Sequence, residues 1–544
     1  AGEAHRLSLA VVDGARGDLC DDLDLGPSAD TTLVPEGLTQ EAWSGWGFDH
    51  FGRPELCSVQ IPAGAGAWEG TLVVSRPPVP RLDHRFALLL PVQPLGAPAD
   101  LVRVAVEYGP LQEPRIQALG WQLDLRRQEI ADRRVRSFFE LARVRALPLR
   151  PVSSLSGRVP ALAITSGEDW ETLAREHRAF FDTAARLKGP VLALAGRVLG
   201  QATPLNSLRE AMRIALDEIE LDASAGRGGG WQLPERASTT VESGKGTASD
   251  RAALLLALLR GAEIRAEVVL ASSTAHRVSP SEPLAILNQT LIVVPDLELR
   301  PGSGPVFVDP SRSSAWLGAL DESVLGRDAL MLRRQGARWL RLPSELPRQQ
   351  WTLNVKEAPV GRYQWTLEGL LDGAPAARVR EWARGRDKGA PMPAEDLAWL
   401  SLPGWSESPL QVQEMDGGRL AVTASGSAGL ELLDEGRLPR PLLPVPAPSW
   451  DDSSWPYARD ARRARVDLLE SWVFDGLTSG TSVGDRKRTT PFWEGDILAS
   501  WSGPVFNRRS RFVFSKDQLA GAAAVEVERF LRFIEEGLGG VSRP

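Results

Sequence analysis

Few residues of this sequence are arranged as the residues of a catalytic site are. One stretch has the form of a helix start that carries a catalytic residue. The stretch SGKGTASDRAALLLALLR, residues 243–260, runs from a glycine-containing turn through a short polar step into an apolar helix. A cysteine at such a helix start would have its pKa lowered from about 8.5 to as little as roughly 3 to 4 by the backbone dipole and an adjacent imidazolium. The position holds Ala248 instead, so the stretch resembles an active site that lacks its nucleophile.

Metal and thiol chemistry have little support elsewhere in the sequence. The five histidines are scattered singly, and no two of them are three or four residues apart, the spacing that puts a pair on one helix face. We therefore expect no metal and no cofactor. The cysteines, Cys20 and Cys57, lie near each other in the sequence, and they either form a disulfide in an oxidising compartment or remain two free thiols.

The order of the parts resembles a family of bacterial proteins with a transglutaminase-like, papain-like core between two β-rich domains. In that family Gly-Asp-Cys-Lys-Asp opens a Leu/Ala-rich helix, Phe-Asn-His begins a later strand, and Asp-Pro ends the next strand. Residues 246–250 (GTASD) take the first place in this chain, residues 287–289 (LNQ) the second, and Asp309 with Pro310 the third. Ala248 thus stands at the family's cysteine and Gln289 at its histidine, 41 residues later.

The resemblance implies a Cys-His-Asp mechanism in which a thiolate attacks, histidine carries the proton and the acid orients the histidine. Ala248 offers no nucleophile and Gln289 no titratable nitrogen, so only Asp309 keeps its family role. Loss of the nucleophile alone costs a serine protease about a millionfold in turnover. We therefore expect a pseudoenzyme, not an enzyme.

Neighbouring residues do not replace the missing groups. Thr247 and Ser249 flank Ala248, but adjacent helix positions point about 100° apart, and neither hydroxyl has a general base in view. His276 reads as an exposed loop histidine. Asp250 reads as a first-turn carboxylate that favours a helix N-terminus, and Asp309 as a turn former at a strand end.

The composition and charge of the sequence limit the classes of protein to which the chain can belong. The chain has 544 residues, 43% of them hydrophobic and 24% charged, which predicts several globular domains. Its 63 basic and 70 acidic residues are interspersed and give a net charge of −7, without the basic stripe that nucleic acid requires. The longest unbroken apolar run, Ala252–Leu259, is far shorter than the roughly 20 residues of a membrane span.

The elements predict an α+β multidomain chain. Short apolar runs broken by Pro and Gly predict a β-sandwich-like domain over residues 1–165, although residues 126–146 suit either a helix or a charged strand. Residues 166–345 predict the transglutaminase-like core, with helices at 166–187, 205–223 and 250–260. Strands return in a β-sandwich-like domain at 346–435 and in a β-rich segment at 436–544, which closes with a helix from Ser515 to Gly537, started by a Ser515–Gln518 capping box.

The resemblance therefore implies a non-catalytic protein that serves as a binding or scaffold component of the bacterial envelope. Its partner would be a protein, bound through a vestigial cleft that includes Trp231, Gly246, Asp250 and Asn288. The chain begins at Ala1 without a charged-then-apolar leader, which predicts a removed signal peptide or a trimmed chain. With the cysteine pair and the family's usual secretion, we expect a periplasmic or cell-surface location.

Two alternatives remain open. In the first, the chain is an active cysteine acyltransferase or peptidase represented by a Cys-to-Ala variant, but such engineering gives no reason for Gln289. In the second, it is an unrelated β-rich protein that binds carbohydrate or protein through exposed tryptophans.

Overall fold

The structure is a computed structural model. The residues it describes are 6–13, 38–42, 55–59, 69–76, 87–91, 99–108, 113–119, 126–129, 135–144, 161–165, 169–222, 233–272, 287, 289–321, 324–358, 362–385, 410–415, 418–428, 459–460, 464–473, 485–490, 493–502, 505–514, 518–519 and 533.

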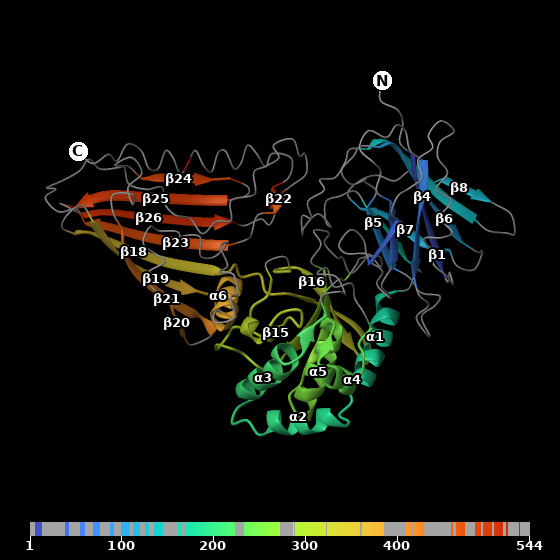
Figure 1. The fold of residues 1–544 in the computed structure, drawn as a ribbon, viewed down its shortest axis with the longest axis horizontal. Coiled ribbons are helices and arrows are strands. Elements are labelled where there is room, and N and C mark those ends of the chain that lie inside the picture. The colour runs from blue at the N-terminus through green and yellow to red at the C-terminus, as the bar shows by residue number, and fades with distance from the viewer. Residues whose placement is uncertain are drawn as a thin grey trace. The chain divides into compact units, whose positions relative to one another are not determined.

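The chain is a mixed α+β protein with large sheets and few helices (Figure 1). It divides into two compact units, one made of residues 1–295 and 327–342, the other of residues 296–326 and 343–544. No helix in the described ranges is long and apolar enough to cross a membrane.

The N-terminal part of the first unit is built from strands, as the Pro- and Gly-punctuated sequence predicts. A three-stranded antiparallel sheet has the order β5 (Ala87–Pro91), β10 (Ala161–Thr165), β7 (Arg115–Leu119). A seven-stranded sheet has the order β2 (Leu38–Ala42), β3 (Glu55–Val59), β4 (Glu69–Arg76), β1 (Arg6–Asp13), β6 (Ala99–Tyr108), β9 (Val135–Val144), β8 (Arg126–Glu129). The ambiguous segment 126–146 is thus a strand pair, and β1 runs parallel to both of its neighbours.

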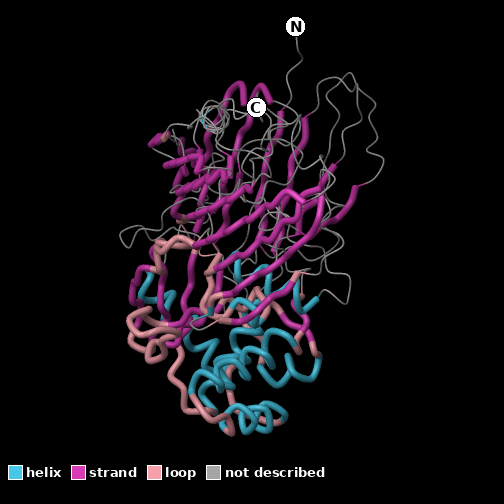
Figure 2. The backbone as a smooth tube through the Cα atoms, turned by 90° about the vertical axis from the view of Figure 1, so that its left-hand side faces the viewer, coloured by secondary structure: helices cyan, strands magenta, loops and turns pink. Residues whose placement is uncertain are grey.

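Helices gather in the described part of the rest of this unit (Figure 2). They are α1 (Trp170–Ala184), α2 (Pro190–Leu199), α3 (Pro204–Met212), α4 (Ala237–Ser243) and α5 (Ala248–Gly261), and α3 continues into a π-helical turn at Arg213–Asp217. Asp169 caps α1 by accepting a hydrogen bond from Thr172 N at 2.7 Å, as its sequence position predicts. A two-stranded parallel pair, β11 (Glu220–Leu221) with β12 (Lys245–Gly246), leads into α5.

Helix α5 is the centre of this helical group, because every side chain from Ser249 to Leu259 is buried. A helix that is apolar nearly all round must be covered on all sides, and α5 contacts each of the other four helices. It also packs against β13 (Glu267–Ala271) and β14 (Gln289–Val294). Within the unit these strands continue into β16 (Asp328–Arg333) and β17 (Gly336–Arg341), in the order β14-β13-β16-β17.

The second unit is organised on one eight-stranded sheet. Its order is β20 (Gln411–Glu414), β21 (Leu420–Ala428), β19 (Arg362–Leu371), β18 (Arg348–Ala358), β23 (Ala464–Val473), β26 (Val505–Phe514), β25 (Trp493–Ser502), β24 (Arg486–Thr489). Burial alternates strictly along β19, the period of a sheet with one covered face. The sheet takes strands from both sides of residue 435, where the sequence suggested a domain boundary.

The covered face of this sheet holds a core rich in aromatic side chains, including Trp351, Tyr363 and Trp365. Helix α6 (Gly373–Gly385) packs onto it through Ala376 and Val379. The unit also contains β15 (Val306–Val308) and a short 3-10 turn at Ser314–Trp316.

The expected start of the C-terminal helix is wrong. Gln518 and Leu519 form the short strand β27, which pairs with β22 (Arg459–Asp460). Gln518 is extended and hydrogen-bonded in a ladder, so it does not act as the third residue of a helix. Of the following segment only Phe533 is described; it is helical and lies against Trp493, with ring centroids 5.4 Å apart.

Candidate functional site

Helix α5 begins at Ala248, the position that corresponds by resemblance to a catalytic cysteine. Thr247 is the N-cap: its hydroxyl accepts from Asp250 N at 3.2 Å, and the Asp250 carboxylate accepts from Thr247 N at 2.8 Å. This reciprocal pair satisfies two helix-start donors. It explains why the helix starts at Ala248, four residues before the apolar run that begins at Ala252.

The Asp250 carboxylate has a structural role beyond the cap. It also accepts from Thr247 Oγ1 at 2.9 Å and from Glu235 N, in the segment before α4, at 2.6 Å. Three donors therefore converge on one buried carboxylate and tie the preceding loop to the start of α5. The expectation of a first-turn carboxylate agrees with this geometry, although no sequence pattern predicts the Glu235 contact.

Gly246 is placed where a side chain has no room. A Cβ added there would lie 2.9 Å from the Asp250 Cβ and 3.0 Å from the Thr240 Cγ2. The glycine thus permits the close approach of β12 to the helix start. It serves the geometry of the turn rather than a ligand.

Ala248 is the exception in residues 246–250, because its four neighbours in this stretch are buried while Ala248 is partly exposed. Gln289, the first residue of β14, is partly exposed as well, whereas the rest of that strand is buried. At both positions at which the resemblance expects a reacting group the residue is therefore partly exposed, although the Gln289 Oε1 itself is buried.

A hydrogen bond joins the two segments that carry these positions. Ser249 Oγ lies 3.2 Å from Thr290 Oγ1, and both residues are buried. Ala248 directly precedes Ser249 and Gln289 directly precedes Thr290, so the start of α5 lies beside the start of β14. Two segments 41 residues apart in the sequence are thereby brought together.

At the two positions that the resemblance assigns to acyl transfer, the side chains are a methyl group and a carboxamide. Methyl and carboxamide groups at Ala248 and Gln289 supply neither a nucleophile nor a proton acceptor of useful basicity. The hydroxyls of Thr247 and Ser249 are engaged by Asp250 and Thr290 respectively. In the described ranges no group of three or more His, Cys, Asp or Glu side chains is arranged to hold a metal ion.

His177 is the histidine whose surroundings the structure describes. It is buried on α1, and its Nδ1 donates to the Leu173 carbonyl oxygen at 2.7 Å. This i to i−4 contact belongs to the packing of α1 and does not orient the ring as a base for Ala248.

Asp309 belongs to the second unit, where it follows β15. Its carboxylate accepts from Ser311 N at 2.9 Å and from Ser311 Oγ at 2.7 Å, and its carbonyl accepts from Arg312 N at 3.1 Å. These contacts close a turn through Pro310, as the DPS sequence predicts. Complete burial raises the pKa of Asp309, although the hydrogen bonds from Ser311 and the charge of Arg312 oppose the shift.

Several expected site residues are not tested. Trp231, Asn288, His276 and Cys20 lie outside the described residues, and of Cys57 only the backbone, in β3, is described. The disulfide and the full lining of the cleft therefore stay predictions.

One buried charge near the site escaped sequence reasoning. Arg251, in the first turn of α5, is 2% exposed; its Nε donates to the Ala215 carbonyl at 3.2 Å and its Nη2 to that of Leu216. Those carbonyls belong to the π-helical turn after α3, so Arg251 joins that turn to α5. A charged residue at the start of a fully apolar helix is the signal that could have identified it.

Comparison with known proteins bears on the fold. No family model matches the sequence, and no curated protein matches it. A solved structure from Parabacteroides distasonis, described as a "putative protease", has a TM-score of 0.50 and 11% identity over 85% of this chain and 74% of its own. At that identity the likeness is one of fold: this chain has a loose structural link to a protease-like protein.

Proposed function

We propose that this chain is a non-catalytic protein with a transglutaminase-like core, acting as a binding or scaffold component of the bacterial envelope. The observation that carries the proposal is the Ser249–Thr290 hydrogen bond, which brings the start of α5 to the start of β14. In the family that the chain resembles, the cysteine stands at the start of that helix and the histidine at the start of that strand. This chain has Ala248 and Gln289 there.

The hydrogen bonds and the close packing at the start of α5 support the proposal that the framework of the site is retained while its catalytic groups are lost. Gly246, Thr247 and Asp250 hold the turn, the cap and the preceding loop in one arrangement. Partly exposed Ala248 and Gln289 beside this arrangement would contact a ligand there without reacting with it. The partner we propose is a protein, with Trp231 and Asn288 on the same cleft.

An activity assay tests the absence of catalysis. The purified chain is incubated with a glutamine-containing protein and a labelled primary amine, and separately with unfolded polypeptide substrates. We expect neither amine incorporation nor cleavage above background. Incorporation that survives dialysis and disappears on heat denaturation would show that the chain is an acyltransferase and would overturn the proposal.

A cross-linking experiment tests the binding role. A short photoreactive amino acid replaces Ala248 in one variant and exposed Leu469, on the sheet of the second unit, in the control. We expect a discrete envelope-protein adduct from position 248 and none from position 469. Equal adduct patterns from both positions would contradict binding at the cleft.

A further inference from the structure

The outer face of α2 carries an unusual concentration of exposed leucines. Six large apolar side chains are exposed among the described residues, and three of them, Leu187, Leu192 and Leu199, lie within thirteen residues of one another. Leu192 and Leu199 are 60% and 56% exposed, the two highest values of the six. They are seven residues apart, which places them on one side of the helix two turns apart.

The inner face of α2 packs against the core. Val191, Ala195 and Val198 are buried, and the helix packs on α5, α3 and α4. Packing against the core therefore explains the apolar residues on the inner side of α2 but not the exposed leucines on its outer side. Small residues, Ala193 and Gly196, separate the two exposed leucines, so the leucines protrude from a smooth surface. We call Leu192, Ala193, Gly196 and Leu199 the α2 patch.

Basic residues predominate in the sequence around α2, although acidic Glu210 and Glu218 lie against Arg197. Residues 183–209 include four basic residues and no acidic one, although the whole chain has a net charge of −7. Arg186 and Lys188 are exposed immediately before α2. Basic residues around a protruding apolar helix face are typical of segments that lie in the interface of an anionic membrane.

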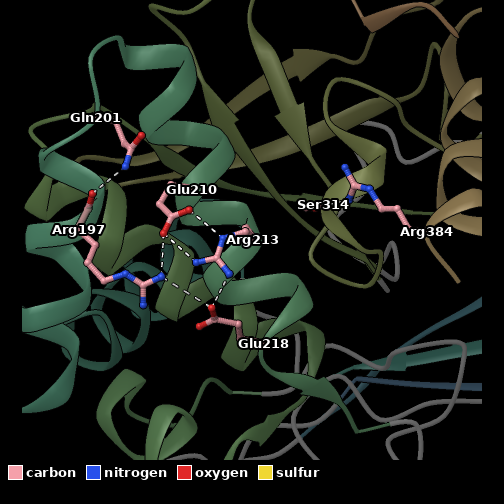
Figure 3. A network of polar contacts seen from close by, with 7 residues as sticks. All are labelled: Arg197, Gln201, Glu210, Arg213, Glu218, Ser314 and Arg384. Carbon is pink, nitrogen blue, oxygen red and sulfur yellow. Dashed lines mark hydrogen bonds and ion pairs between the residues drawn. The ribbon is translucent and has the colours of Figure 1, made fainter. Parts of the chain in front are cut away.

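The basic residue within the helix is held in place from the next helix. Arg197 Nη2 donates to Glu210 Oε1 at 2.9 Å, and Arg213 donates to both oxygens of Glu210 at 2.8 Å (Figure 3). The hydrogen bond from Arg213 holds the pKa of Glu210 below its usual range. The network fixes α2 against α3, so the α2 patch is presented by a rigid element, and it leaves Arg186 and Lys188 as the cations beside the leucines.

We propose that the α2 patch, with Arg186 and Lys188, docks the protein peripherally on an anionic lipid bilayer, with the leucines in the headgroup region. Charge favours this occupant over a second copy of the chain, because a symmetric contact through α2 would bring the same basic segment against itself. This docking is independent of whether the core is catalytic.

Vesicle flotation tests the docking. The full chain is mixed with vesicles of equal parts phosphatidylglycerol and phosphatidylcholine, or of phosphatidylcholine alone. We expect binding to the anionic vesicles only, and we expect it to fall as ionic strength rises, because salt screens the contribution of Arg186 and Lys188. Binding to both vesicle types alike, or to neither, would overturn the proposal.

Single substitutions locate the contact. Leu192→Glu and Leu199→Glu should each weaken binding at least about tenfold, because a carboxylate then faces anionic headgroups. Leu469→Glu and Leu498→Glu, at exposed leucines of the eight-stranded sheet, should leave it unchanged. All four sites are exposed, so circular dichroism should show an unaltered fold. If Leu192→Glu dissociates an oligomer and leaves flotation unchanged, the α2 patch is a protein interface and the membrane proposal fails.

Discussion

At the scale of single residues, the site is defined by what surrounds Ala248 rather than by Ala248 itself. Asp250 satisfies the backbone of Thr247 and Glu235, and Ser249 meets Thr290. The sequence identified Ala248 and Asp250 because a glycine turn before an apolar run has a known local geometry. It could not show the Glu235 or Thr290 contacts, because tertiary packing sets them.

Asp250→Ala should lower the free energy of unfolding by about 1 to 3 kcal/mol, because it removes a helix cap and leaves the Glu235 amide without its acceptor. Urea denaturation followed by far-ultraviolet circular dichroism measures this change. Glu242→Ala, at an exposed carboxylate on α4, is the control and should change stability by less than about 0.5 kcal/mol. Equal effects of the two substitutions would argue against the structural role of Asp250.

Asp309 gives a prediction with a defined pH dependence. Burial raises its pKa in the folded state, so the folded chain favours the protonated carboxyl, and this contribution is lost as the pH rises through the folded-state pKa. Asp309→Asn should therefore raise the unfolding temperature at neutral pH, and the gain should shrink below about pH 4, where the unfolded-state carboxyl is also protonated. Thermal scans across pH test this, with exposed Asp296→Asn as a control that shows no such trend. A destabilising Asp309→Asn at neutral pH would contradict it.

At the scale of elements, hydrophobic periodicity and capping residues predicted some of the helices and missed others. Helices α1, α3 and α5 have capping residues, α1 and α3 have apolar stripes, α5 is apolar nearly all round, and the sequence identified all three. Helices α2, α4 and α6 escaped because Pro and Gly near their starts resemble loop signals, although Pro190 at the first turn of α2 is a helix-start signal. Segment 126–146 stayed ambiguous because its charges suit an exposed strand as well as a helix, and pairing between β8 and β9 decides it.

A buried ion pair joins β23 and β26, and no sequence pattern predicts it. Arg508 Nε and Nη2 donate to the Glu470 carboxylate at 2.5 and 2.6 Å, and the two side chains are 1% and 2% exposed. They are directly opposite in register, on the covered face of the sheet, with Leu353 beside Glu470 on β18.

Removing one partner of this pair should cost more than removing both. Arg508→Met leaves a buried carboxylate uncompensated and should destabilise the chain by about 3 to 5 kcal/mol, whereas Glu470→Leu combined with Arg508→Met should be near neutral. Urea unfolding of the single and double variants provides the comparison. A double variant less stable than the single one would show that the pair contributes more than it costs to bury.

At the scale of the whole molecule, the two compact units follow packing rather than the order of the sequence. Residues 296–326 belong with the C-terminal sheet, although they lie between strands of the first unit. The sequence predicted the α+β class and the return to strands after residue 346, because both depend on local pattern. It could not predict that strands on either side of residue 435 join one sheet, because such pairing is long-range.

The central claim, a retained site framework without its chemistry, can be tested by restoring the missing groups. The measurement is the rate of iodoacetamide alkylation against pH for Ala248→Cys, alone and with Gln289→His, read at the individual peptide by mass spectrometry. Ser243→Cys, an exposed thiol at the C-terminal end of α4, is the control. We predict that Cys at 248 titrates below the ordinary thiol pKa of about 8.5 and that the second change lowers it further, while the control does not. A thiol at 248 that titrates like the control, and does not respond to histidine at 289, would contradict the account.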